Sequence, residues 1–138
     1  MAGGRDWAGT QAPSLADFEA LAARAWRRLP RRFRDLCGDV VIRVEDFATD
    51  EVLRELKLSS PFDLMGLYQG VSLDRKSVMD TASLPSMVFL YRRPILDYWA
   101  EQEETLGHLV THVLVHEVGH HFGLSDADMA HIEATAGD

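Results

Sequence analysis

The sequence predicts a small α+β domain in which a three- or four-stranded mixed sheet is backed by one long helix. Three observations lead to this prediction. The chain has 138 residues, enough for one domain with a real core. Helical stripes and short β-branched runs follow the order helix, strand, short helix, two strands, long helix and short helix. No internal repeat or low-complexity tract interrupts this order.

The N-terminal part is predicted to be a leader followed by a helix. Residues 1–13 are rich in Gly and Ala and are expected to form a flexible leader, so that a single domain would span residues 14–138. Ser14 is a favourable N-cap for a helix that Pro30 should end. The buried stripe of this helix would be Phe18, Leu21, Ala22, Ala25, Trp26 and Leu29.

Three strands are predicted in the middle of the chain. Residues 40–45 form a β-branched run that is typical of a buried strand, and a short helix should follow over residues 50–56. The second strand is expected around residues 66–71 and the third over residues 87–91. A polar loop over residues 74–83 would connect them.

The C-terminal part is predicted to be mostly helical. Pro94 should stop the third strand, and a helical region should extend over residues 95–122 with a break near residues 97–102. Its buried stripe would be Leu106, Leu109, Val110, Val113 and Leu114. Ser125 can cap a last short helix that runs through Glu133.

The composition is that of a soluble globular protein, and it limits the partners. A net charge of −8 argues against a general nucleic-acid binder, and no apolar stretch has the length of a membrane span. The N-terminus lacks the apolar core of a secretion signal, and Cys37, the only cysteine, is read as a small buried hydrophobe. Since no internal disulfide can form, we expect a cytoplasmic location.

One local group of charges departs from the acidic balance. It consists of Arg24, Arg27, Arg28, Arg31, Arg32 and Arg34. These arginines could bind an anionic partner, but a solvated and salt-bridged surface is the favoured reading. The sequence leaves their role open.

The most informative segment reads His-Glu-Val-Gly-His-His-Phe-Gly-Leu-Ser-Asp, an HExxH motif extended to HExxHxxGxxD. His116 and His120 are four residues apart, so on a helix both imidazoles can point to one metal ion. Glu117 is rotated by roughly 100° from His116 and would lie beside the open side of the metal, where a water binds. Gly123 can adopt the left-handed conformation that ends a helix, which lets Asp126 supply a third ligand. Three protein ligands and one open position are typical of catalytic zinc.

Three other histidines lie near this motif. His112 is one turn upstream of His116 and is expected to be a neighbour of the ligands, whereas His108 is two turns away and is expected to be only polar. His121 points away from the ligand side of the helix, so we expect it at the rim or in a hydrogen bond. An ordinary amphipathic helix is the alternative reading of the whole segment, and the spacing to Asp126 argues against it.

Several segments together carry a family resemblance: residues 29–34, 40–46, 66–70, 84–94 and 112–126. On these segments the chain resembles the small bacterial zincin-like metallopeptidases, over roughly residues 14–135. The resemblance implies a minimal zincin fold with one zinc ion per chain, held by His116, His120 and Asp126. It also implies that Glu117 is the catalytic acid and base.

The expected function is that of a zinc-dependent peptidase acting on extended or unstructured peptides, with no nucleic-acid or membrane partner. Glu117 would take the proton of the attacking water, and Tyr68, Tyr91 or Tyr98 could stabilise the oxyanion, although the sequence does not rank them. The alternatives are a non-catalytic zinc module that mediates a partner contact and, less favoured, a metal-dependent endoribonuclease. Glu117 argues against a non-catalytic module, because a purely structural site has no use for a carboxylate beside an open metal position. Glu117 and the acidic balance of the chain both argue against the endoribonuclease, since such nucleases lack the glutamate of HExxH. Substrate preference and oligomeric state stay open.

We also expect the substrate to add a strand to an exposed edge of the sheet, and residues 66–71 are the best candidate for that edge. Either Leu67 or Gln69 would then present its N–H outward, where a proline substitution would interfere with peptide pairing.

Overall fold

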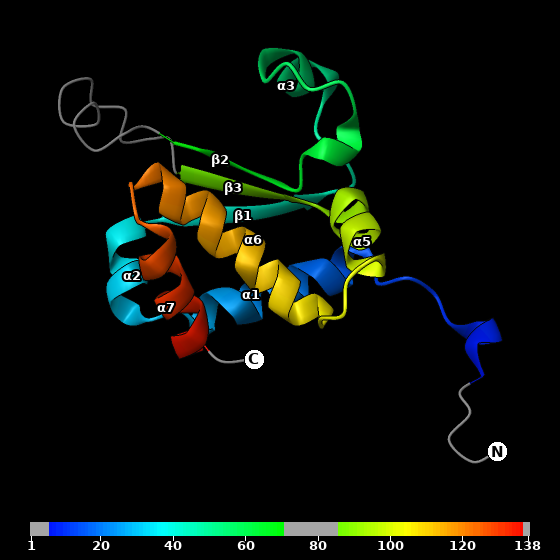
Figure 1. Cartoon of the computed structure of the whole chain (residues 1–138), viewed down its shortest axis with the longest axis horizontal. Coiled ribbons are helices and arrows are strands. Elements are labelled where there is room, and N and C mark those ends of the chain that lie inside the picture. Colours follow the sequence, from blue (N-terminus) through cyan, green and yellow to red (C-terminus); the bar gives the residue numbers. More distant parts are fainter. Residues whose placement is uncertain (1–5, 71–85, 137–138) are drawn as a thin grey trace.

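The computed structural model describes residues 6–70 and 86–136, and it has a three-stranded mixed sheet with helices packed on one face (Figure 1). The strands are β1 (Val40–Glu45), β2 (Gly66–Gln69) and β3 (Ser86–Tyr91), in the order β1-β3-β2. β1 pairs with β3 in parallel, and β2 pairs with β3 antiparallel. The predicted small mixed sheet is thus confirmed, with β2 at one edge.

The helical layer consists of α1 (Leu15–Arg28), α2 (Arg31–Cys37), α5 (Arg92–Ala100), α6 (Leu106–His121) and α7 (Asp126–Ala136). α1 and α6 pack against each other below the sheet (Figure 1). Alternate residues of the central strand point into this layer, and both Val88 and Leu90 are 0% exposed. Phe18 of α1 and Leu114 of α6 are equally buried, so one core holds the sheet and the two helices together.

The other face of the sheet carries a smaller apolar cluster. Leu53 of α3 (Asp50–Glu55) packs there with Tyr91, and the partly buried Leu67 and Phe89 lie against it. The short 3-10 helix η2 (Pro61–Asp63) follows α3 on this side (Figure 1). The predicted short helix over residues 50–56 is confirmed.

The first predicted helix is confirmed, but the segment after it differs from the prediction. Ser14 and Asp17 form a capping box, with Ser14 N–H donating to Asp17 Oδ2 at 2.8 Å and Asp17 N–H donating to Ser14 Oγ at 3.1 Å. Pro30 ends α1, yet it also starts α2, which was not predicted. Proline suits a helix start because its missing N–H has no partner there.

The region after β3 is also helical from an earlier point than predicted. β3 ends at Tyr91 and α5 begins directly at Arg92, so that Pro94 lies in the first turn of a helix and does not stop a strand. The predicted break occurs at residues 101–105, slightly later than expected. Three parts of the prediction lie outside the described residues: the loop over residues 74–83, the end of the second strand at Val71 and residues 1–5 of the leader.

Before α1, the described part of the leader forms the short 3-10 helix η1 (Trp7–Gly9), and Pro13 C=O accepts a hydrogen bond from Arg92 Nε at 2.6 Å. The predicted division into a flexible leader over residues 1–13 and a domain over residues 14–138 stays a prediction. Within residues 6–70 and 86–136, no helix combines the length and apolar character that crossing a membrane requires.

Candidate metal centre

The long helix α6 is fixed by its apolar side before it presents any polar residue. Thr105 caps its N-terminus, with His108 N–H donating to Thr105 Oγ1 at 3.1 Å. The residues of α6 that are at most 1% exposed are Leu109, Val110, Leu114, Val115 and Val118. This burial fixes the rotation of the helix, and the side that carries His112, His116 and His120 is left for contacts with α7.

The turn after α6 has the conformation that the sequence predicts. Gly123 has a φ of +74°, and its N–H donates to His120 C=O at 3.1 Å. Leu124 N–H donates to Gly119 C=O at 2.9 Å, which completes a Schellman-type end. Ser125 then caps α7 by accepting a hydrogen bond from Asp128 N–H at 3.0 Å. The chain therefore reverses within three residues, and Asp126 becomes the first residue of α7.

The structure brings the three predicted ligands together. One ligand atom each of His116, His120 and Asp126 lies within 4.8 Å of the other two. His116 is half-buried, whereas His120 and Asp126 are exposed. Burial lowers the pKa of His116, and the neighbouring His112 lowers it further, which favours the neutral imidazole that a metal requires. Two imidazoles and one carboxylate are a donor set suited to Zn²⁺.

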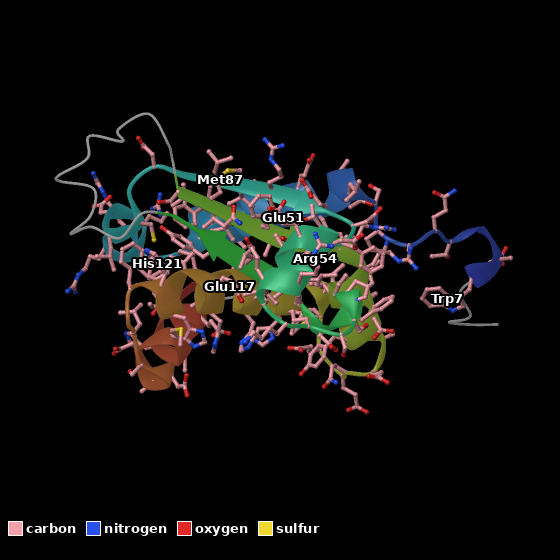
Figure 2. The ribbon with its side chains drawn as sticks, turned by 90° about the horizontal axis from the view of Figure 1, so that it is seen from above. Trp7, Glu51, Arg54, Met87, Glu117 and His121 are labelled. Carbon is pink, nitrogen blue, oxygen red and sulfur yellow. The ribbon has the colours of Figure 1, made fainter. Side chains whose placement is uncertain are left out.

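Glu117 projects from another side of α6, toward the edge strand. Its carboxylate accepts a hydrogen bond from Tyr68 N–H of β2. Burial raises the pKa of Glu117 to about 7, and this hydrogen bond opposes that rise. In Figure 2, which views the sheet from above, Glu117 and His121 lie along α6 beside β2. A half-buried carboxyl with a pKa near neutrality is suited to exchanging protons with a substrate.

Gly66 allows this close approach of β2 to α6. A Cβ at Gly66 would lie 2.8 Å from Val113 Cγ1 and 3.0 Å from Glu117 Cγ, so any side chain there would force a neighbouring group to shift. The close approach that glycine permits in this strand is therefore that of the protein's own helix α6.

The direction of the backbone groups in β2 differs from one expectation. Tyr91 N–H donates to Met65 C=O at 3.0 Å, so the backbone of residue 65 faces β3. Backbone groups alternate along a strand, and Leu67 and Gln69 therefore also face β3. The prediction that one of these two presents its N–H outward was wrong. The outward backbone groups belong to Gly66 and Tyr68, and the N–H of Tyr68 is the one bonded to Glu117.

Sequence reasoning missed Glu133 of α7. Its two carboxylate oxygens lie 3.0 Å from His112 Nδ1 and 3.4 Å from His116 Nε2. These three residues form a second group whose ligand atoms lie within 4.8 Å of one another. A signal was present, because Asp126 and Glu133 are seven residues apart and such residues share one side of a helix. The expectation for His112 as a neighbour of the ligands agrees with this geometry.

The other histidines have separate contacts. His108 Nδ1 lies 2.7 Å from Glu104 Oε2, and His108 belongs to neither group of candidate ligands among the described residues. The ring of His121 packs on the ring of Tyr68 with centroids 4.1 Å apart, and burial lowers the pKa of His121. His121 thus contacts the edge strand and not the ligand groups, in keeping with the expectation that it points away from them.

The three tyrosines differ in position. Tyr98 is exposed on α5, and Tyr91 is 2% exposed in the smaller apolar cluster. Burial raises the pKa of Tyr91 to about 12, with Glu45 and Glu117 adding to the rise. Tyr68 is half-buried, and its backbone N–H bonds to Glu117. Tyr68 therefore contacts Glu117 through its backbone, whereas Tyr91 interacts with the same carboxylate electrostatically.

The family model described as zincin-like metallopeptidase matches residues 37–136, which include the whole sheet and both helices that carry the candidate ligands. No curated protein matches the chain.

Proposed function

The chain belongs to the zincin-like metallopeptidase family, and on that premise we propose that it is a zinc-dependent peptidase. His116, His120 and Asp126 hold one zinc ion per chain, and Glu117 is the general base. The observation that carries this proposal is the division of roles around α6, with three candidate ligands gathered toward α7 and the half-buried carboxyl of Glu117 beside the edge strand.

The residues of the chain then have definite tasks. Bound zinc supplies a Lewis acid that polarises a carbonyl oxygen and makes water acidic enough to be a nucleophile near neutral pH. Glu117 accepts the proton of the attacking water and later delivers it to the leaving amine. The hydrogen bond from Tyr68 N–H keeps the Glu117 carboxylate in one orientation, and a nearby cation further favours its ionised form.

The substrate is an extended peptide that adds a strand to the outer edge of β2. Only backbone groups with free hydrogen-bonding capacity at this edge can pair with it, and the best placed are both groups of Gly66 and the C=O of Tyr68. Pairing through the main chain gives affinity with little side-chain selectivity. Tyr68 is bonded to Glu117 through its backbone N–H, and we take it as the first choice for the oxyanion donor among Tyr68, Tyr91 and Tyr98.

The experiment that tests this function compares Glu117→Gln with Glu104→Gln. Both variants are loaded with zinc, and hydrolysis of an unstructured peptide library is followed by mass spectrometry. Glu117→Gln should retain zinc and lose at least a hundredfold in rate, since an amide cannot accept the proton. Glu104→Gln should cleave like the wild type, because Glu104 contacts His108 outside the candidate site.

Two results would contradict the proposal. A wild-type protein that binds no zinc when zinc is supplied would exclude a zinc enzyme. Zinc binding without cleavage of any peptide would instead favour the non-catalytic zinc module.

The place of peptide binding is tested by amide chemical shifts. On adding an unstructured peptide, shifts should appear at residues 66–69 and around His120, whereas shifts confined to the arginines of residues 24–34 would refute pairing at β2.

A further inference from the structure

We propose that α6 and α7 form a second, alternative zinc position, made by His112, His116 and Glu133. It shares His116 with the first position, so one ion occupies either position but not both. Two imidazole nitrogens and one carboxylate oxygen make up both donor sets, and a His₂Glu set also holds zinc in other proteins. Both positions are therefore expected to bind the same divalent cation, Zn²⁺.

The distances between the donor atoms support this position. Zinc bonds of about 2.0–2.2 Å in tetrahedral geometry separate the ligand atoms by about 3.4 Å. Glu133 Oε2 lies 3.4 Å from His116 Nε2, and Glu133 Oε1 lies 3.0 Å from His112 Nδ1. Small side-chain rotations are enough to place all three around one ion.

The second group is also less exposed than the first. Its members are all half-buried, with side-chain exposures of 46% for His112, 26% for His116 and 12% for Glu133. In the first group His116 is the shared half-buried residue, whereas His120 and Asp126 are exposed. Contacts with each other hold the three residues in place, since the rings of His112 and His116 lie 4.0 Å apart and Glu133 bridges them. An ion in the second position would thus meet ligands that are already ordered.

Exclusive occupancy follows from the chemistry of His116. A neutral imidazole has one unprotonated nitrogen, so it binds one ion unless it loses a further proton. The second position replaces His120, one turn after His116, with His112, one turn before it. An ion in the second position lies farther from Glu117, which points toward β2. If the proposed function holds, the second position stores zinc in an inactive state.

The test removes the first position and asks whether metal binding persists. In the double variant His120→Asn/Asp126→Asn, Co²⁺ serves as a probe of the zinc position, followed by equilibrium dialysis and by its absorption spectrum. Both replaced residues are exposed, and circular dichroism verifies that the variant is folded. We expect this variant to bind one ion per chain. Adding Glu133→Gln should raise its Kd for Co²⁺ at least tenfold, and adding His108→Gln, the matched control in the next turn of α6, should leave the Kd unchanged.

A double variant that binds no Co²⁺ would overturn the proposal, and so would binding that Glu133→Gln does not weaken. Zinc binding by the wild type in the same assay would leave the proposed function standing in either case. Two ions per wild-type chain would refute exclusive occupancy. A milder variant gives a second readout: in Asp126→Asn, zinc should shift the ring nitrogen signals of His112, and unchanged His112 signals would refute the second position.

Discussion

Replacing Gly66 with alanine tests the contact on which the position of Glu117 depends. The new Cβ would lie 2.8 Å from Val113 Cγ1, 3.0 Å from Glu117 Cγ and 3.2 Å from Phe89 C=O. Val113 is β-branched and stiff, and the Phe89 oxygen belongs to the central strand, so neither can move easily. β2 must therefore shift away from α6, which lengthens the hydrogen bond from Tyr68 N–H to Glu117.

The expected cost follows from two opposing contributions. Inserting a methyl group into a filled space destabilises by about 1–3 kcal/mol. Alanine also restricts the unfolded chain, which offsets about 0.4–1 kcal/mol of that cost. The free energy of unfolding should thus fall by about 1–2 kcal/mol, and Tm should fall by roughly 4 °C for each kcal/mol.

The measurement is urea unfolding together with hydrogen exchange of the Tyr68 amide. Gly107→Ala is the matched control, because a Cβ there would meet only Leu21 Cδ2 at 3.9 Å, an ordinary contact. That variant should be neutral or more stable by up to about 1 kcal/mol, as expected for alanine in a helix. If Gly66→Ala were as stable as Gly107→Ala and its Tyr68 amide equally protected, the close approach of β2 to α6 would not be tight.

Two further predictions concern α7, which carries Asp126, and Cys37, which is the only cysteine of the chain. Ser125→Ala removes the cap of α7 and should lower the free energy of unfolding by about 1 kcal/mol. It should also weaken zinc binding, because Asp126 and Glu133 both lie on that helix. Ser14→Ala should cost a similar amount at α1 without changing the zinc affinity. Burial raises the pKa of Cys37 from 9.0 to about 12, so the native thiol should resist Ellman's reagent at pH 8 and react on unfolding. Since the pKa of Cys37 is higher in the folded than in the unfolded chain, the protonated thiol adds stability that is complete below pH 9 and is lost as the pH rises toward 12. In Cys37→Ala, the free energy of unfolding should therefore depend less on pH between 9 and 12.

Sequence reasoning predicted those elements whose signals are local. The capping box at Ser14, the β-branched run of β1 and the glycine that ends α6 each act within a few residues, and all three elements form where they were predicted. The prediction that β1 is a buried strand was wrong, because β1 lies at an edge of the sheet and only its Val44 is buried. The helix stop at Pro30 was predicted correctly, but α2 directly after it was missed, and Pro94 was wrongly taken as a stop, because proline is compatible with both the end and the start of a helix. Only the neighbouring elements decide between these two roles.

The candidate ligands show the same limit at the level of tertiary structure. His116 and His120 follow from spacing on one helix, and Asp126 follows from the turn at Gly123. The position of Glu133 beside His112 and His116 depends in addition on how closely α7 packs on α6. Gly119 determines this packing distance. A Cβ at Gly119 would lie 2.5 Å from Met129 Sδ, and Met129 is fully buried, so the absence of a side chain lets α7 lie directly on α6. With a larger residue at 119, α7 would sit farther out and Glu133 would not reach His112 and His116. A glycine and a methionine ten residues apart carry no recognisable metal-site pattern, and this packing therefore had to be seen in the folded chain.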